Sequence, residues 1–185
     1  MIVSIALPQG FIYRPEFLSE SEERKLLAHL KDVDFAELRM RERIARRRVA
    51  HFGWLYGYDS WKIEPGPPIP EFLEDVRERA ATLVGVPPDE FVEVLVTEYP
   101  PGAPIGWHRD APMFGVVVAV SLLSAARLRL RERSSGKASV SLTIEPRSAY
   151  VLRGPARTKW QHSISPAKET RYSITFRTLR ATKTA

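Results

Sequence analysis

The second half of the chain is a series of short β-type segments, and this pattern constrains the fold more than any other feature. The segments after Glu90 are rich in β-branched and aromatic residues or alternate between apolar and polar side chains. They cover residues 91–97, 115–123, 127–133, 139–144, 149–152 and 171–178. Short strands that follow one another this regularly predict an antiparallel sandwich or barrel.

Two of these segments differ in the burial that they predict. Residues 116–120 read Val-Val-Val-Ala-Val without polar alternation, which indicates a central strand covered on both faces. Residues 127–131 read Arg-Leu-Arg-Leu-Arg and lead through Ser-Ser-Gly-Lys into a second alternating segment. We expect a hairpin there, with one solvent-exposed basic face.

The first ninety residues predict helices. Ser19 and Glu22 have the spacing of a capping box, so a helix begins there and runs to about Lys31. A second helix begins near Pro70, after a loop at 59–70, and ends at Gly85. We therefore expect one α+β, mainly β domain over residues 1–185, with a β core at 91–180 and a supporting segment at 11–90.

The composition excludes several classes of protein. The chain has no cysteine, so a disulfide framework, a thiol nucleophile and thiolate metal sites are excluded, and any metal is bound by His, Asp or Glu. No stretch has the apolar length of a membrane span, and the short apolar start lacks the positive flank of a signal peptide. We expect a cytoplasmic monomer with no membrane association and no obligate protein partner.

Three residues are candidate metal ligands. His108 and Asp110 follow the turn at 100–104, and we expect them where a strand begins or resumes. Residues two apart in an extended chain point to the same side, so this pair supplies two thirds of the facial triad that holds non-haem Fe(II). His162 is the remaining histidine among the predicted strands, although such a triplet alone is weak evidence.

The last predicted strand carries two arginines on one face. Alternation places Arg171, Ser173, Thr175 and Arg177 together, with Tyr172, Ile174 and Phe176 opposite. In one interpretation the polar face is exposed to solvent. In the other it points into the domain, where a guanidinium holds the carboxylate of a small dicarboxylic acid.

A basic and aromatic segment precedes the β core. Residues 39–48 hold six arginines and the single Glu42, and they lead into Phe52, Trp54, Tyr56 and Tyr58, which share one face of an extended chain. These rings are either a stacking wall for nucleic acid beside a cationic track, or part of the hydrophobic core. The net charge of +6 and the pI near 9.8 favour a polyanionic partner.

Taken in order, these motifs resemble the AlkB family of Fe(II)- and 2-oxoglutarate-dependent dioxygenases. The matching set is His108-x-Asp110, His162 and Arg171-x5-Arg177, with Tyr99-Pro100-Pro101-Gly102 and Gly154-Pro155-Ala156-Arg157 as neighbouring phrases. The resemblance covers residues 11–180. It implies a double-stranded β-helix, or jelly roll, with supporting N-terminal helices.

The resemblance also implies roles for individual residues. His108, Asp110 and His162 correspond to the metal ligands, Arg171 to the arginine that binds the distal carboxylate of 2-oxoglutarate, and Arg177 to the arginine near its metal-chelating end. Tyr99 matches a tyrosine that contacts the cosubstrate, and Thr97 stands where the family often has asparagine. Residues 111–113 lack the acid that repair members place after the metal aspartate.

The reaction implied is oxidative N-demethylation of alkylated bases in DNA or RNA, which uses O2 and releases succinate, CO2 and formaldehyde. Residues 39–61 correspond to the nucleotide-recognition lid. Within it, Trp54 and Tyr56 are the expected base contacts, Arg46, Arg47 and Arg48 the phosphate partners, and His51 a rim residue. Two alternatives stay open: the same chemistry on a protein or small molecule, and a non-catalytic jelly-roll binding module.

Overall fold

The computed structural model describes residues 7–40, 43–56, 63–134 and 139–180. Its helices are α1 (Glu20–Leu30), α2 (Glu74–Val84) and α3 (Gly154–Thr158), with short 3-10 helices η1 (Glu71–Leu73) and η2 (Pro88–Glu90). Its strands are β1 (Phe11–Arg14), β2 (Ala36–Met40), β3 (Arg43–Tyr56), β4 (Ile63–Pro65), β5 (Phe91–Tyr99), β6 (Ile105–His108), β7 (Phe114–Leu122), β8 (Ala126–Glu132), β9 (Ser139–Ile144), β10 (Ala149–Leu152), β11 (Trp160–Ile164) and β12 (Arg171–Leu179).

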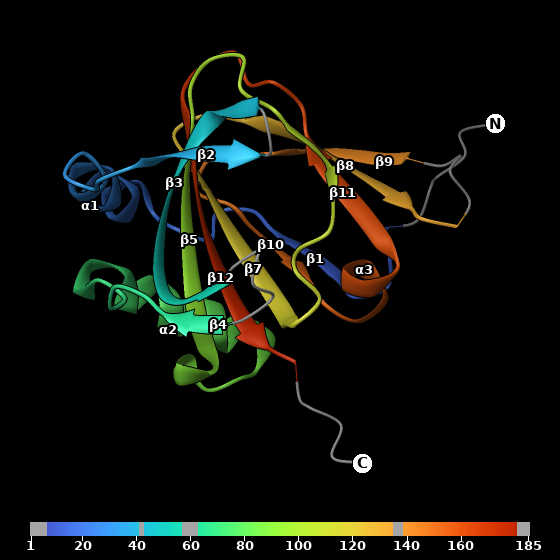
Figure 1. Ribbon diagram of the computed structural model, residues 1–185, viewed down its shortest axis with the longest axis horizontal. Helices are drawn as coiled ribbons and strands as arrows, with labels where there is room; N and C mark the ends of the chain where they lie inside the picture. Colours follow the sequence, from blue (N-terminus) through green and yellow to red (C-terminus); the bar gives the residue numbers. More distant parts are fainter. Residues whose placement is uncertain (1–6, 41–42, 57–62, 135–138, 181–185) are drawn as a thin grey trace.

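The strands form two antiparallel sheets that face each other (Figure 1). Across the described ranges, the large sheet has the order β1-β10-β7-β12-β5-β3-β2, with β4 paired to β3. The small sheet has the order β6-β11-β8-β9. Two stacked antiparallel sheets with crossing connections are the architecture of a jelly roll.

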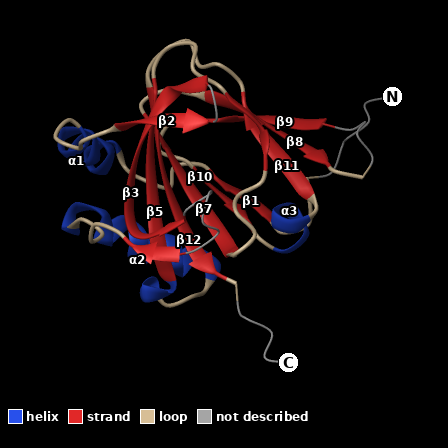
Figure 2. Ribbon diagram, in the orientation of Figure 1, coloured by secondary structure: helices blue, strands red, loops and turns tan. Residues whose placement is uncertain are grey.

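Helices α1 and α2 cover one face of the large sheet, and Figure 2 shows both on the side away from the small sheet. Their apolar residues pack against one face of β5, β7 and β12 in a common core that includes Leu30, Leu73, Val96, Val120 and Phe176. The capping box of Ser19 and Glu22 is present as predicted. Gly85 ends α2 in the left-handed conformation, with φ of 73°.

The space between the two sheets is divided into an apolar and a polar part. One part is a core to which the large sheet contributes Val117, Ala119 and Leu152 and the small sheet contributes Leu128 and Leu130. The other part holds buried polar side chains of the large sheet, namely Glu93, Thr97, Ser121, Arg171, Ser173, Thr175 and Arg177. Because burying these groups is costly without partners, the polar part is where a functional site is expected.

Most of the predicted strands are confirmed, including the covered central strand β7 and the β8–β9 hairpin with its leucines inside and its arginines outside. Two expectations were wrong. The strand at the His108 pair ends at His108 instead of beginning there, so Asp110 lies beyond β6. Part of the loop expected at 59–70 is the strand β4, while residues 59–62 lie outside the described ranges.

The polar face of β12 turns inward. Its residues Ile174 and Phe176 pack against the helix-side core, so alternation directs Arg171 and Arg177 toward the small sheet. The interpretation of this face as solvent-exposed was therefore wrong. None of the described helices is long and apolar enough to cross a membrane.

Candidate active site

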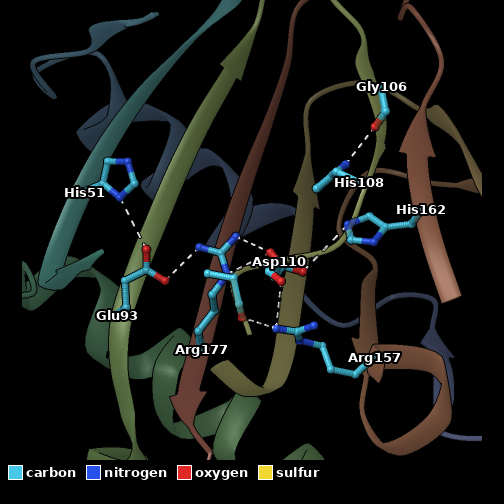
Figure 3. Close-up of polar contacts among 9 residues, drawn as sticks. His51, Glu93, Gly106, His108, Asp110, Arg157, His162 and Arg177 are labelled. Atoms are coloured by element: carbon cyan, nitrogen blue, oxygen red, sulfur yellow. Dashed lines mark hydrogen bonds and ion pairs between the residues drawn. The ribbon is translucent and has the colours of Figure 1, made fainter. Parts of the chain in front are cut away.

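The pairing of β6 with β11 brings the two predicted ligand histidines together. His108 is the register partner of His162, and their ring centroids are 4.1 Å apart. Asp110, two residues beyond the end of β6, places its Oδ2 atom 3.9 Å from His162 Nε2 (Figure 3). Side chains from two strands and one loop therefore meet at one end of the polar space.

The turn before β6 is held from both sides. Gly102 has φ of +77°, a conformation that glycine adopts without strain, and its N–H donates to the Ala167 carbonyl over 2.8 Å. The Arg46 guanidinium donates to the carbonyls of Pro101 and Gly102. The same turn was predicted as a boundary, and the structure shows that Arg46 braces it.

Both histidines present a neutral imidazole. His108 donates its Nδ1 proton to the Gly106 carbonyl over 2.8 Å, which leaves a lone pair on Nε2. Burial, together with the neighbouring imidazole of His108, lowers the pKa of His162 to about 3, and burial also lowers the pKa of His108. Metal ligation requires deprotonated imidazole nitrogens, and these environments favour that form.

Asp110 is an ionised carboxylate with one oxygen paired and one unpaired. Its Oδ1 accepts hydrogen bonds from Arg177 Nε at 3.0 Å and Nη2 at 2.6 Å. Burial raises the pKa of the Asp110 carboxyl, but the positive charge of Arg177, with smaller effects of the two neighbouring imidazoles and of Arg157, brings the pKa below its ordinary value. Oδ2 is buried and has no hydrogen-bond partner.

The donor set fits a metal ion, although the side chains do not yet surround one point. No three His, Asp or Glu groups in the described part of the chain meet the geometry of a metal site as they stand. Two neutral imidazoles and one carboxylate are nevertheless the ligand types of the non-haem Fe(II) triad. The buried, unpartnered Asp110 Oδ2 is an atom that a cation would satisfy.

Arg177 is fixed between two buried carboxylates. Beside its bonds to Asp110, its Nη1 donates to Glu93 Oε2 over 2.8 Å, and Glu93 is only 2% exposed. Burial lowers the pKa of Arg177, but Glu93 and then Asp110 raise it above its ordinary value. Arg177 thus remains charged and sets the orientation of Asp110. Sequence reasoning missed Glu93, whose role depends on the pairing of β5 with β12.

Arg171 is a buried cation without an anionic partner. It is 1% exposed, donates from Nε to Ser121 Oγ over 2.9 Å, and lies 4.9 Å above the Tyr99 ring. Its Nη1 atom is buried and has no partner. Thr97 is buried beside it, on the neighbouring pair of β5 and β12. A buried guanidinium left unpaired is costly, so this position favours a bound anion.

Two further residues of the site were missed. Tyr150 is buried in the core between the two sheets, and burial raises the pKa of its hydroxyl while the nearby charge of Arg171 lowers it less, so the phenol stays protonated. Arg157 is buried and donates from Nη2 to the carbonyls of Asp110 and Ala111. Arg157 is the last residue of the Gly154-Pro155-Ala156-Arg157 motif of the family resemblance, and this motif could have indicated its place in the site.

Comparisons with known proteins decide the family. A family model described as the 2OG-Fe(II) oxygenase superfamily matches residues 10–177. The chain belongs to this superfamily. The oxygenase is accordingly an Fe(II)- and 2-oxoglutarate-dependent dioxygenase, as the resemblance predicted.

Relatives of the oxygenase place it with AlkB-like proteins. It is 28% identical over 153 residues to "Alpha-ketoglutarate-dependent dioxygenase AlkB" of Escherichia coli (strain K12), covering 72% of this chain and 70% of that protein. It is 27% identical over 173 residues to "tRNA (carboxymethyluridine(34)-5-O)-methyltransferase alkbh8" of Xenopus tropicalis. That match covers 90% of this chain, which spans only 27% of the alkbh8 protein.

A solved structure confirms the fold of the oxygenase. The structure of OsALKBH1 superimposes with a TM-score of 0.73 and 16% sequence identity. The superposition covers 94% of this chain and 99% of that one. The predicted mainly β jelly roll with supporting helices is therefore confirmed.

The three arginines expected as phosphate partners do not lie on one side of the oxygenase. Ala50 and Phe52 pack in the helix-side core, so alternation puts Arg48 on that face of β3 and Arg47 on the inner face. Arg48 pairs with Glu98 at 2.6 Å, and Arg46 braces the turn at 100–104. The positive charge of Arg47 contributes to the lowered pKa of His108, after the larger effect of burial.

Trp54, one of the two expected base contacts, lies on the helix side and not beside the histidines. Trp54 lines a pocket on the helix side with Ile69, Arg77 and Val92, and the side chain of Tyr56 lies outside the described part. His51 lies on the inner face, where its Nδ1 is 3.4 Å from Glu93 Oε1 without forming a hydrogen bond. Phe52 is partly buried against the core. The described aromatic side chains of β3 therefore do not form a wall that faces the histidines.

Proposed function

We propose that this dioxygenase catalyses the oxidative N-demethylation of alkylated bases in nucleic acid and releases succinate, CO2 and formaldehyde. One observation carries the catalytic part of this proposal. An unpartnered carboxylate oxygen, Asp110 Oδ2, and an unpartnered guanidinium nitrogen, Arg171 Nη1, are both buried in the polar part of the inter-sheet space. A metal cation and a dicarboxylate would satisfy these two atoms.

In the proposed mechanism His108, Asp110 and His162 would hold the iron, and Arg171 would bind the distal carboxylate of 2-oxoglutarate in a charge-assisted hydrogen bond. Iron, 2-oxoglutarate and O2 together supply an oxidation that hydroxylates a nearby C–H bond. When that bond belongs to an N-methyl group, the hydroxymethyl product breaks at its C–N bond to give formaldehyde and the free base nitrogen.

The residues of this chain contribute position and electrostatics. Arg177, held by Glu93, keeps the Asp110 carboxylate ionised and aims it toward the histidines. Arg157 fixes the backbone of Asp110 and Ala111, so the loop after β6 keeps its place. Ser121 and the Tyr99 ring orient Arg171, which reduces the reorganisation needed when the anion binds.

Nucleic acid is the substrate class favoured by charge and by relationship. The chain has a net charge of +6, and the charge of Arg47 acts on His108 at the site. The name of the alkbh8 relative includes a tRNA substrate. A methylated peptide or a methylated small molecule is the competing class for the same chemistry.

The test measures succinate from 2-oxoglutarate and formaldehyde from the substrate. Purified protein with Fe(II) and ascorbate receives methylated oligonucleotides, methylated peptides of similar length, or no substrate. We expect formaldehyde with oligonucleotides only, and none from the Asp110→Asn variant, while Asp89→Asn is the matched control. Formaldehyde released from peptides alone would overturn nucleic acid as the substrate class. Unchanged activity of the Asp110→Asn variant would overturn the assignment of Asp110 as a metal ligand.

A second candidate is hydroxylation of a modified tRNA base without loss of a carbon. The alkbh8 relative, which matches 90% of this chain, favours this candidate. It is distinguished by its product, because the nucleoside then gains one oxygen atom and no formaldehyde appears. Mass spectrometry of nucleosides from treated tRNA separates the two reactions.

A further inference from the structure

The outer face of the small sheet carries a row of arginines that have no acidic partner among the described residues. Arg127, Arg129 and Arg131 alternate on β8 with the buried Leu128 and Leu130, so all three guanidinium groups are directed away from the inter-sheet core. Strand geometry spaces alternate residues by about 6.8 Å. We call Arg127, Arg129, Arg131 and the adjacent Trp107 the outer basic face.

Neutral groups hold these arginines in place. Arg127 donates from Nη2 to Ser141 Oγ over 2.7 Å, Arg129 from Nε to Ser163 Oγ over 3.2 Å, and Arg131 from Nε to Gln161 Oε1 over 2.9 Å. Arg129 and Arg131 also lie 4.9 and 4.4 Å from the Trp107 ring centroid. The side chains are therefore ordered while their charges stay uncompensated.

Several arginines elsewhere on the surface differ in this respect. Arg48, Arg79 and Arg147 each pair with a carboxylate. Among the ion pairs of the described residues, none includes an arginine of the outer basic face. The strand registers place Gln161, Ser163, Ser139, Ser141 and Thr143 opposite these arginines, and none of these residues is acidic. Like charges this close repel each other, so a bound polyanion would relieve the repulsion.

We infer that the outer basic face binds the phosphodiester backbone of the nucleic-acid substrate, outside the reacting nucleotide. Guanidinium groups bind phosphate oxygens through parallel hydrogen bonds, and the Nη groups of Arg129 and Arg131 have no hydrogen-bond partner in the described part of the chain. Trp107 connects this face to the site, because it directly precedes His108 on β6. This inference rests on the proposed nucleic-acid function. It adds the place on the protein where the nucleic acid that flanks the reacting nucleotide lies.

The test compares two variants that each lose three positive charges. R127Q/R129Q/R131Q removes the face, and R14Q/R24Q/K31Q removes exposed charges elsewhere as the matched control. Binding of an unmodified single-stranded DNA of about 20 nucleotides is measured by fluorescence anisotropy over a range of salt concentrations. Each lost phosphate contact on a single strand lowers the slope of log K against log salt by about 0.7.

We expect the slope to fall by about two and the affinity at low salt to fall more than tenfold in the face variant only. Single R129Q, which changes the surface least, is expected to lower the slope by about 0.7. Equal slopes in the face variant and its control would overturn the inference. Preferential loss of binding to phosphatidylserine vesicles, with DNA binding unchanged, would also overturn it.

Turnover of a methylated dinucleotide separates this inference from the proposed function. A dinucleotide is too short to span the face, so both triple variants are expected to keep wild-type turnover. Turnover of methylated DNA combined with equal salt slopes would refute the outer basic face alone. A slope that falls as expected, in a protein that demethylates no nucleic acid, would support the face and refute the proposed reaction.

Discussion

Strands β12 and β8 both alternate arginine with apolar residues, but they face in opposite directions. On β12 the apolar side chains pack against the helix-side core, and Arg171 and Arg177 are buried between the sheets. On β8 the leucines are buried between the sheets, and the arginines face outward. The difference arises because helices cover the outside of the large sheet, so its inner face is free to carry polar groups.

The comparison also separates three environments of an arginine. Arg177 is held by two buried carboxylates, Arg171 is buried with one neutral partner, and the arginines of the outer basic face are held by neutral groups in contact with water. Burial strengthens electrostatic interactions, while water screens them. The same substitution should therefore have very different effects at these three places.

Arg177→Met should have the largest effect on stability. It leaves Glu93 and Asp110 as two buried carboxylates without their cation, and breaking such a buried pair costs about 3–5 kcal/mol. Urea denaturation of the metal-free protein measures the change in the free energy of unfolding. Adding Glu93→Gln to Arg177→Met should recover part of the loss, and a loss below about 1 kcal/mol for Arg177→Met would contradict the buried network.

Glu93→Gln should have an intermediate effect. Glutamine keeps the size and one acceptor, but Arg177 then loses a charged partner, at a cost of about 1–3 kcal/mol. Asp110 is also held less firmly, so Mn(II), a redox-stable substitute for iron, should bind more weakly. Glu98→Gln, on the opposite face of β5, is the matched control, and equal Mn(II) affinity in both variants would refute a positioning role for Glu93.

Arg129→Met should change stability little. The side chain is partly exposed and contacts Trp107 and Ser163, so its loss should cost less than about 1 kcal/mol in the free energy of unfolding. Thermal unfolding beside Arg177→Met makes the comparison direct. A loss as large as that of Arg177→Met would mean that the outer basic face is structural.

The smallest effect is expected at the Arg79–Glu22 pair, which joins α2 to the first turn of α1. The hydrogen bond from Arg79 is the largest of the causes that lower the pKa of Glu22 from 4.5 to about 2. Because the folded-state pKa is depressed, this stabilisation is present above pH 4.5 and is lost as the pH falls toward 2. The difference in unfolding free energy between wild type and Arg79→Ala should stay below about 1 kcal/mol and shrink across that range.

Periodicity and turn chemistry allowed much of the fold to be predicted. The segments of β7 and β12 are long and rich in β-formers, and the ends of α1 and α2 carry capping signals. The bounds of β6 and the existence of β11 were not predicted, since both strands are short and carry polar and aromatic residues. Their extended conformation depends on pairing with each other and, for β11, with β8.

The residues of the candidate site that belong to a sequence motif were predicted. Residues whose place depends on the register between strands were missed. His108, Asp110 and His162 come together as expected, with Arg171 beside Tyr99 and Thr97. The role of Glu93 depends on its register opposite Arg177, and alternation alone did not show which face of β12 is buried. Trp54 and Phe52 lie on the face of β3 that the helices cover. The sequence shows that the two rings share a face, but it does not show which face of the sheet that is.

Binding of 2-oxoglutarate to Arg171→Met tests the central claim most directly. The Mn(II)-loaded protein is titrated with 2-oxoglutarate by calorimetry, beside Arg129→Met as the matched arginine of β8. Loss of a charge-assisted hydrogen bond should weaken binding about 10- to 100-fold in Arg171→Met and leave it unchanged in Arg129→Met. Wild-type affinity in Arg171→Met would contradict the assignment of this buried arginine to the cosubstrate.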